Sequence, residues 1–296
     1  MPEFSSNSAK PFQKRCLFCD NLKDFFRIPY SLVARLYRLI FARPSMQFLN
    51  NIILQLALNG RGFNNCCDLK TSGEANFLEI LRKHNPKICV DIGANKGEYS
   101  RFILEKTNSN VIAFEPLPCV FEDLVTLKSK FPDRFNIINK GVGDCEGVFQ
   151  LFFGEKSYLA SFSKEASSIG YVGDNNTKSI QVEVITLDGY FSQNFENEID
   201  ELDLLKIDTE GFEYEVLIGA EITIRRLRPK FIQIEYNWHQ MFKSHSLYKI
   251  SSLLSGYNVY QILPYGSGLN LIDPSRPESN IFHYSNFVFV RGDIII

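Results

Sequence analysis

The sequence predicts an α/β fold built around a mostly parallel sheet, and three observations predict it. An apolar run at residues 88–90 leads through Asp91 into a glycine loop and then into a helix-like segment, 99–106. This strand, turn and helix pattern is typical of the first unit of a nucleotide-type domain. Similar strand-like runs follow along the chain, at 111–114, 135–139, 202–208 and 231–236. With 296 residues and 45% hydrophobic content, the chain can bury a sizeable core.

The glycine loop between 91 and 98 indicates the kind of ligand. Gly93 can adopt the left-handed backbone angles of a sharp turn, and it lets the backbone approach a ligand closely. Dinucleotide loops usually place a second glycine where this chain has Asn95. The Asp91 carboxylate would repel a pyrophosphate, but it suits a ligand that carries an ammonium and a sulfonium. That chemistry favours S-adenosylmethionine, although a plain strand-to-helix turn fits the loop by itself.

An acidic residue ends the second strand-like run. Glu115 follows the glycine loop by about 20 residues, which is where a carboxylate can accept hydrogen bonds from ribose hydroxyls. NAD-binding and adenosylmethionine-binding proteins share this arrangement. Glu115 therefore supports a ribose without choosing the cofactor.

The third unit places Asp144 after the strand-like run at 135–139. Asp144 could accept a hydrogen bond from an adenine amine, with Val142 stacking near the ring. Gly143-Asp144 is also ordinary turn chemistry, so both interpretations stay open.

The fourth unit carries two carboxylates at a strand end. Asp208 and Glu210 follow the run 202–208, and ligands of open α/β sheets bind at this edge. Lys206 and Asp208 share one face of the strand because side chains alternate. A lysine in such an apolar run needs a partner, and Asp208 or a neighbouring carboxylate can supply it. Glu210 can also be explained as a residue at a helix start.

The fifth unit ends in Glu235, with Trp238 and His239 close behind it. These residues are expected over the same edge as Asp208. An acid and a histidine there are suited to taking a proton from a hydroxyl. A surface histidine beside a partly buried tryptophan is the alternative interpretation.

With these motifs in order, the chain resembles the FkbM-type S-adenosylmethionine-dependent methyltransferases from about Ser72 to its end. The most specific phrase is Lys206-Ile207-Asp208-Thr209-Glu210-Gly211, after the glycine loop. The resemblance also rests on the segments 72–78, 90–100, 113–116, 186–188 and 215–220. The third unit departs from the family, because Lys140-Gly141-Val142-Gly143 is richer in glycine than expected.

The resemblance implies a Rossmann-like class I methyltransferase fold, with a seven-stranded, mostly parallel sheet and helices on both faces. It also implies methyl transfer to a hydroxyl, often on a sugar, glycan or polyketide, with S-adenosylmethionine as donor. Carried onto this chain, it places cofactor contacts at Asp91, Gly93, Gly97, Glu115 and Asp144. We add the neighbouring positions Ala94, Asn95, Tyr99, Ser100, Pro116, Val142 and Asp208.

The expected reaction is an in-line displacement in which the protein mainly positions the reactants. A sugar hydroxyl is a poor nucleophile at neutral pH, so a general base is expected, with Glu235, His239 and Asp208 as candidates and Glu210 lining the same edge. A divalent cation held by Asp208, Glu210 and Glu235 is a second, less favoured way to activate the hydroxyl.

The composition sets broad limits on partners and compartment. The formal net charge is −2, so no general attraction to nucleic acid is expected. Seven cysteines without regular spacing, in a chain with no apparent signal peptide, favour free thiols and a cytoplasmic location. Cys16 and Cys19 lack a second pair of ligands, so no metal is expected there.

The chain divides by pattern into a disordered tail at 1–20, a helical segment at 21–70 and a methyltransferase domain at 71–296. The helical segment is expected to cap the substrate cleft. A peripheral contact with the inner face of an anionic membrane, made by residues 21–58, is the alternative. The oligomeric state is not readable.

Acceptor pockets should come from insertions and end segments, here 21–70, 154–179 and 264–286. The insertion at 154–179 is expected to be a mobile loop over the pocket. Trp238 and Tyr265 are candidates for stacking on a sugar ring, and core or surface positions explain them equally well.

Two other functions remain. A scaffold domain without catalysis, within a glycan-assembly complex, is opposed by the row of edge carboxylates. An NAD-dependent dehydrogenase is opposed by Asp91 and Asn95.

Overall fold

The computed structural model describes residues 30–65, 68–154, 160–163, 178–195 and 198–296. The predictions for the tail at 1–20, for Cys16 and Cys19, and for most of the 154–179 insertion lie outside these residues. Contacts divide the chain between Ala57 and Leu58 into two units. The second unit carries the sheet and the candidate site.

The predicted α/β class is confirmed. In the second unit, eight strands form one sheet in the order β10-β9-β11-β8-β7-β1-β2-β3. Their bounds are β1 Ile88–Ile92, β2 Asn110–Phe114, β3 Phe135–Ile138, β7 Leu204–Ile207, β8 Phe231–Tyr236, β9 Tyr257–Leu263, β10 Gly268–Leu271 and β11 Ser285–Arg291. Strands β3, β2, β1, β7 and β8 pair in parallel, whereas β8, β11, β9 and β10 pair antiparallel.

The sheet has one strand more than the seven predicted. The eighth strand, β10, forms a hairpin with β9 through the short 3₁₀ turn Pro264–Gly266. The predicted substrate segment at 264–286 therefore contains β10, a second 3₁₀ turn at Pro277–Ser279 and the start of β11. Tyr265 lies in the hairpin turn with 74% of its surface exposed.

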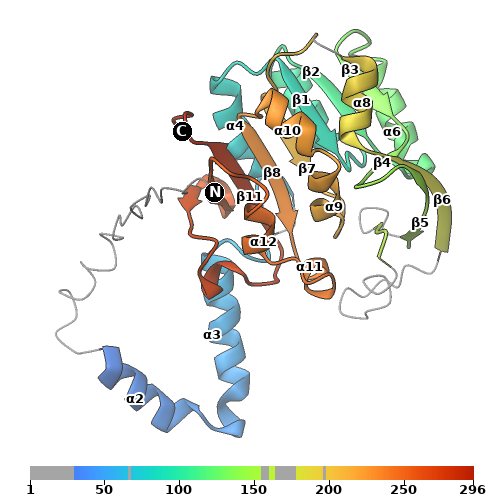
Figure 1. Ribbon diagram of the computed structural model, residues 1–296. Helices are drawn as coiled ribbons and strands as arrows, with labels where there is room; N and C mark the ends of the chain where they lie inside the picture. The colour runs from blue at the N-terminus through green and yellow to red at the C-terminus, as the bar shows by residue number, and fades with distance from the viewer. Residues whose placement is uncertain (1–29, 66–67, 155–159, 164–177, 196–197) are drawn as a thin grey trace, which may run out of the picture. The chain divides into compact units, whose positions relative to one another are not determined.

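Helices cover both faces of the large sheet, as predicted. Among the described residues, the helices of the second unit are α4 Glu74–Lys83, α5 Glu98–Lys106, α6 Pro118–Lys128, α8 Leu187–Asn194, α9 Glu213–Ile218, α10 Glu221–Leu227, α11 His239–Phe242 and α12 Leu247–Ser251. Figure 1 shows α8, α9 and α10 in front of the sheet.

Strand alternation divides the core into two layers. Side chains at Cys89, Val111 and Leu204 pack with α4, α5 and α6, whereas those at Val90 and Ile112 pack with α8, α9, α10 and α12. Both sets are almost entirely buried. Near-continuous apolar strands are typical of a parallel sheet covered on both faces.

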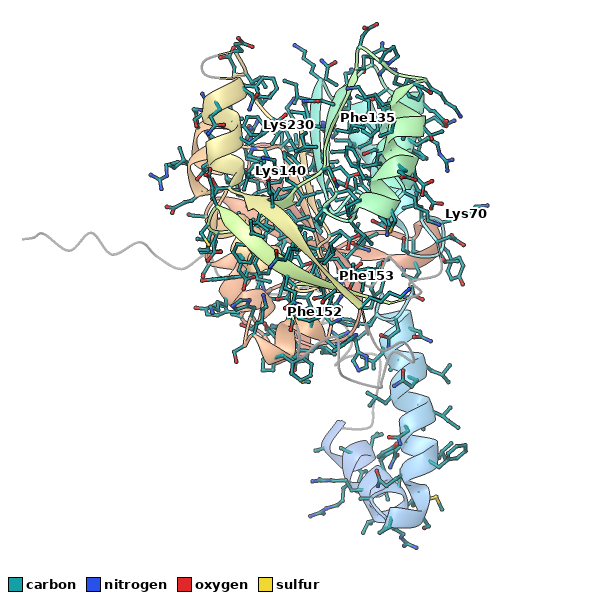
Figure 2. The ribbon with its side chains drawn as sticks, turned by 90° about the vertical axis from the view of Figure 1, so that its right-hand side faces the viewer. Lys70, Phe135, Lys140, Phe152, Phe153 and Lys230 are labelled. Carbon is teal, nitrogen blue, oxygen red and sulfur yellow. The ribbon has the colours of Figure 1, made fainter. Side chains whose placement is uncertain are left out.

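A second sheet of three strands lies beside the first. It has the order β4-β6-β5, with β4 Gly141–Val142, β5 Gly147–Phe153 and β6 Lys178–Ile185. Figure 2 labels Phe152 and Phe153 on β5. The glycine-rich departure in the third unit is explained here, because Gly141 and Gly143 are crowded by Phe162 and Phe212. An added Cβ would lie 2.9 and 2.7 Å from these rings.

The first unit contains α2 Tyr30–Phe41, a 3₁₀ turn at Pro44–Met46 and most of α3 Gln47–Gly60. The Asn50 side chain joins the two helices, because its Oδ1 accepts from the Tyr37 hydroxyl and its Nδ2 donates to the Phe41 carbonyl. Within the part of the chain that the structure describes, no helix is both long and apolar enough to cross a bilayer.

Candidate functional site

A cavity of about 900 Å³ lies at the carboxyl ends of β1, β2, β7 and β8, with part of the small sheet as one wall. Parallel α/β sheets bind ligands at this edge. Predicted site residues in its lining are Gly93, Ala94, Asn95, Tyr99, Glu115, Pro116, Val142, Asp208, Glu210 and Glu235. Trp238 also lines it.

The glycine loop lies directly against the end of β7. Gly93 has φ +79°, and an added Cβ there would lie 1.7 Å from the Asp208 carbonyl oxygen. The amides of Gly93 and Ala94 both donate to the Phe114 carbonyl at the end of β2. The loop is thus fixed between two strand ends, and only glycine fits at its closest approach.

Glu115 lies beside this loop and is tied to it. Its carboxylate accepts from the Asn95 amide at 2.9 Å and from the Leu117 amide at 2.8 Å. Burial raises the pKa of Glu115 to about 7, although the two backbone hydrogen bonds oppose this shift. The carboxylate therefore titrates near neutrality at the cavity wall.

A buried charged row runs across the sheet just below the cavity. Asp91 and Lys206 are register neighbours on β1 and β7, with Asp91 Oδ1 3.6 Å from Lys206 Nζ. Asp91 Oδ2 accepts from the Ser100 hydroxyl at 2.6 Å. Asp91 is fully buried and does not appear in the cavity lining. Its contact with a ligand stays a prediction, and its neighbours give it the role of a counter-ion for Lys206.

Lys206 holds the centre of the row. Its Nζ donates to Asp208 Oδ2 at 2.9 Å and lies 4.9 Å from the centre of the Tyr99 ring. Burial lowers the pKa of Lys206, but the carboxylates of Asp208, Asp91 and Glu74 outweigh burial and raise it. The lysine is therefore charged, and its partners are Asp208 and the neighbouring strand's Asp91, the kinds of partner that the sequence predicted.

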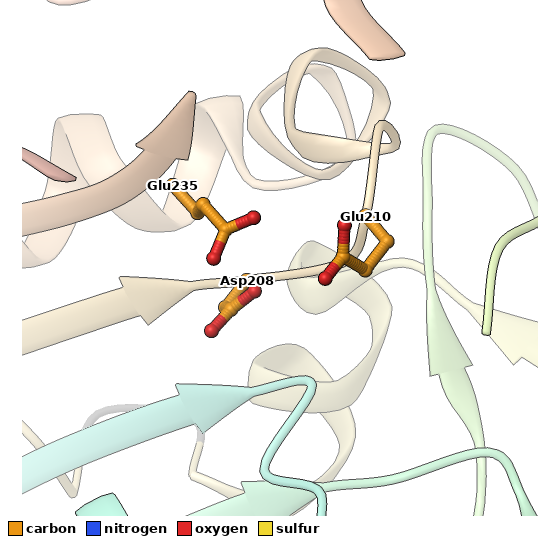
Figure 3. Close-up of side chains that lie close together, drawn as sticks. All are labelled: Asp208, Glu210 and Glu235. Atoms are coloured by element: carbon orange, nitrogen blue, oxygen red, sulfur yellow. The ribbon is translucent and has the colours of Figure 1, made fainter. Parts of the chain in front are cut away.

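Three carboxylates converge above this row. One carboxylate oxygen from each of Asp208, Glu210 and Glu235 lies within 4.8 Å of the other two, and Figure 3 shows the three side chains turned toward one space. Asp208 directly follows β7 and Glu235 is the last residue but one of the adjacent parallel strand β8, whereas Glu210 lies in the loop after β7. We call this group the carboxylate cluster. The three residues therefore lie together at one edge of the sheet, as the sequence predicted.

Electrostatics inside the carboxylate cluster favour protonation. Burial, followed by the nearby charges of Asp208 and the other acids, raises the pKa of Glu235 well above its ordinary value. Burial and the charges of Asp208 and Glu213 do the same for Glu210. Like charges at this spacing, away from water, cannot all ionise together near neutral pH.

Asn237 joins two members of the cluster, and the sequence analysis gave it no role. Its Nδ2 donates to Glu235 Oε1 at 2.7 Å and to Glu210 Oε2 at 3.0 Å. Its Oδ1 accepts from the amide of His239. The only sequence signal was a polar residue two positions after Glu235, which is too common a pattern to single out.

Contacts with His239 and Glu213 fix the loop that carries Glu210. Glu210 has φ +52°, and the next residue, Gly211, packs its backbone against His239. The carboxylate of Glu213 accepts from the amides of Thr209 and Gly211, which fixes the turn. Glu213 is a second residue that the sequence analysis missed.

His239 contacts this loop rather than the cavity. Its Nδ1 donates to the Glu210 carbonyl at 2.5 Å, and its ring is absent from the lining. Burial lowers the pKa of His239 to about 4, with the Glu210 carbonyl opposing and Lys243 adding to the shift. The imidazole is therefore neutral at pH 7. Its predicted role as a base stays a prediction, and its contacts support a positioning role.

A polar chain on the α4 side of the cavity was also missed. Gln233 on β8 accepts from the Tyr99 hydroxyl and donates to Glu74 Oε1 at 2.6 Å. Glu74 begins α4 and lines the cavity, and burial raises its pKa. These contacts fix Tyr99, whose ring faces Lys206. A glutamine within an apolar strand was the available signal.

Besides Asp91, three predicted cofactor residues lie away from the cavity lining. Gly97 turns the chain into α5 at φ +78°, and Ser100 is used by Asp91. Asp144 is exposed beside Cys145, outside the cavity, because Gly141 and Val142 enter the small sheet as β4 and carry the chain past it. The geometry therefore gives the adenine contact at Asp144 no support, whereas Val142 does line the cavity.

Solved structures with weak similarity are methyltransferases or related proteins. They include a precorrin-6y C5,15-methyltransferase from Geobacter metallireducens, at 12% identity and TM-score 0.39 over 79% of this chain and 96% of that chain. Fibrillarin from Aeropyrum pernix with bound S-adenosyl-L-methionine is similar at 11% identity and TM-score 0.36, over 70% of this chain and 66% of that one. No curated protein matches.

The family model gives the decisive match. The model for the methyltransferase FkbM domain matches residues 91–259, from the carboxylate at the glycine loop to the middle of β9. This span includes the glycine loop, Glu115 and the whole carboxylate cluster, and it covers more than half of the chain. The chain therefore belongs to the FkbM-domain methyltransferases, and S-adenosylmethionine-dependent methyl transfer is its class of reaction.

Proposed function

We propose that this chain transfers a methyl group to a hydroxyl of a sugar, a glycan or a related small molecule. The observation that carries the proposal is Glu235, a cavity-lining carboxylate whose pKa is raised by burial and by its acidic neighbours. A carboxylate of this kind is a stronger base than an exposed one, and deprotonating a hydroxyl requires such a base. The proposal keeps the expectation that nucleic acid is not the acceptor, given the net charge of −2.

The cavity residues fit S-adenosylmethionine in three respects. Gly93 lines the cavity, at a turn whose left-handed angles and close contact with the Asp208 carbonyl only glycine allows. Glu115 retains unused acceptor capacity for ribose hydroxyls. Asp208 presents a carboxylate toward the cavity for the amino group. When bound, the cofactor supplies an activated methyl group on a sulfonium.

The protein's residues then orient the acceptor and remove its proton. Glu235 is the proposed base, because it lines the cavity and Asn237 fixes its Oε1, which leaves Oε2 for the acceptor hydroxyl. Lys206 holds Asp208 by an ion pair, so Asp208 is less available as a base. The aromatic rings of Trp238 and Tyr284 line the same cavity and are proposed to contact the acceptor.

A divalent cation in the carboxylate cluster is the alternative means of activating the hydroxyl. The close approach of its oxygens favours it, and carboxylates are the ligands that Mg²⁺ prefers. The existing partners favour the base instead: Lys206 neutralises Asp208, and the Asn237 amide bridges the other two. Turnover that is lost with a chelator and restored by Mg²⁺ would support the cation.

The proposed function is tested by binding first and by transfer second. We expect calorimetric titration to show binding of S-adenosylmethionine and none of NAD. We also expect labelled methyl from the cofactor to appear in an alkali-stable ether on a sugar acceptor. Label on nitrogen or carbon would contradict O-methylation. Binding without transfer to any of a broad panel of sugar and glycan acceptors would favour the scaffold function.

Binding of S-adenosylmethionine should weaken below about pH 7. The pKa of Glu115 is about 7, so at lower pH its carboxyl group is protonated in the free protein. This proton must leave before the carboxylate can accept hydrogen bonds from the ribose hydroxyls. The dissociation constant should then rise up to about tenfold for each pH unit below 7. Calorimetry between about pH 5.5 and about pH 8, a range that brackets the pKa of Glu115, measures this dependence.

Glu115→Gln is the control for this pH dependence. The variant has no titrating group at this position, so its dissociation constant should be higher but nearly independent of pH over the same range. An unchanged pH dependence in Glu115→Gln would assign the titration to another group.

A further inference from the structure

The helices of the first unit expose an unusual amount of apolar surface. Among the described residues, twelve of the twenty-four exposed large apolar side chains lie between Leu32 and Leu56. Leu39, Phe48 and Leu56 are 63%, 77% and 66% exposed. Such a concentration of exposed apolar side chains indicates an interaction site, whereas single exposed apolar residues scattered over a surface are ordinary.

The apolar side chains of α2 lie on one face of the helix. Leu32, Leu36 and Leu39 recur at helical spacing, with Val33 and Ile40 beside them. Arg38 lies on the opposite face, and Arg35 lies at the edge of the apolar face, beside Leu39. An apolar face flanked by basic side chains is typical of helices that lie in a membrane interface.

All the charged side chains between residues 30 and 65 are basic. From Tyr30 to Asn65 the sequence contains Arg35, Arg38, Arg43 and Arg61 but no Asp or Glu, although acidic residues outnumber basic ones over the whole chain, 34 to 32. The basic charge is therefore concentrated on the segment that exposes its apolar side chains. Anionic lipid headgroups are complementary to this combination, whereas a neutral apolar partner would not need the arginines.

The two helices form a prearranged pair. The Asn50 side chain links Tyr37 and the end of α2, as described above, and the Tyr37 and Phe41 rings stack with centroids 4.5 Å apart. Pro44 begins the turn between the helices. Apolar side chains of α3, in the row Phe48, Ile52 and Leu56, are exposed like those of α2.

We propose that α2 and α3 form a docking surface for an anionic membrane. The apolar side chains enter the boundary between headgroups and acyl chains, while Arg35, Arg38 and Arg43 contact the headgroups. The sequence pattern favoured a cap over the cleft, whereas the exposed apolar residues and the exclusively basic charge favour the membrane contact, which was the alternative. The inference is independent of the methyl acceptor. It directs the enzyme toward substrates that are held at, or produced on, a lipid surface.

Flotation of the full-length chain with lipid vesicles tests this proposal. We expect binding to vesicles that contain phosphatidylserine, and weak binding to pure phosphatidylcholine. The double variant Arg35→Glu and Arg38→Glu should bind the anionic vesicles about thirtyfold less tightly, because each basic residue near an anionic lipid surface strengthens membrane binding. Leu36→Asp should also lose binding, because it places a charge in the apolar face.

Matched control variants exist on α10. Arg225→Glu with Arg226→Glu makes the same change of charge at two exposed positions of a helix, and Ile222→Asp introduces an aspartate at a 64% exposed apolar position. Both controls should bind vesicles like the unaltered chain. Equal binding by the α2 and α10 variants would overturn the assignment of the surface.

Two further outcomes would also overturn the proposal. Absence of binding to anionic vesicles, together with a lower melting temperature in Leu36→Asp, would indicate that the helices cover the protein itself. A dimer in light scattering that becomes a monomer in Leu36→Asp, again without vesicle binding, would identify a second copy of the chain as the occupant.

Discussion

Glu235→Gln is expected to bind S-adenosylmethionine normally and to lose methyl transfer by a factor of about 10² to 10⁴. The glutamine amide has almost the shape of the carboxylate, so the contact with Asn237 can re-form by rotation of the amides. It cannot accept a proton from a hydroxyl. Calorimetric binding and steady-state turnover, measured on the same sample, separate the two effects.

The pH dependence of turnover gives an independent check on Glu235. Its pKa is raised, so near neutral pH the base is partly or fully protonated, and turnover should increase as the pH rises and the carboxylate ionises. The residual activity of Glu235→Gln should lack this increase. Normal turnover in the variant would remove Glu235 as the base and leave Glu210 or Asp208.

Glu122→Gln is the control for loss of one carboxylate. Glu122 is exposed on α6, outside the cavity lining, so turnover should be unchanged. Glu210→Gln is the informative comparison within the carboxylate cluster. If Glu210 acts only by raising the pKa of Glu235, the Glu210→Gln variant should lose less turnover than Glu235→Gln.

Lys206→Met is expected to destabilise the fold by about 3–5 kcal/mol, the typical cost of removing one partner from a buried ion pair. The methionine fills a similar volume but leaves the carboxylates of Asp91 and Asp208 without their cation. Within the described residues, Asp91 Oδ1 has no hydrogen-bond donor to replace it. Urea unfolding at neutral pH measures the loss directly.

Lys140→Met provides the matched control on the surface. Lys140 pairs with Glu183 at 2.7 Å, but both side chains are exposed, at 40% and 63%, and Figure 2 labels Lys140. Exposed pairs contribute at most about 1 kcal/mol because water screens them. Similar losses in the two variants would contradict the assignment of Lys206 as the buried counter-ion.

A double variant separates charge from packing at Lys206. If the cost arises from unpaired charge, adding Asp208→Asn to Lys206→Met should recover part of the lost stability. If it arises from packing, the second substitution should add a further loss.

Much of the sheet could be predicted from the sequence because parallel strands in a covered sheet are continuous apolar runs. The runs before Asp91, Glu115 and Asp208 became β1, β2 and β7, and their acids lie at the carboxyl edge because parallel strands all end there. The extra strand β10 was missed. Its four residues, Gly268–Leu271, are too short for a periodic signal, and pairing with β9 defines them as a strand.

The candidate site divides in the same way. The sequence by itself determined which acids reach one edge, since each follows an apolar run and parallel strands all end at the same edge of a sheet. The pairing of β7 with β8, which places Asp208 and Glu235 side by side, belongs to the tertiary structure. The tertiary structure alone decided which groups face the cavity and which support it. Asp91 pairs with Lys206 in the sheet and does not line the cavity. His239 contacts the backbone of the Glu210 loop, and Asn237 donates hydrogen bonds to two carboxylates. Such pairings depend on contacts between segments far apart in the chain, and local periodicity carries no information about them.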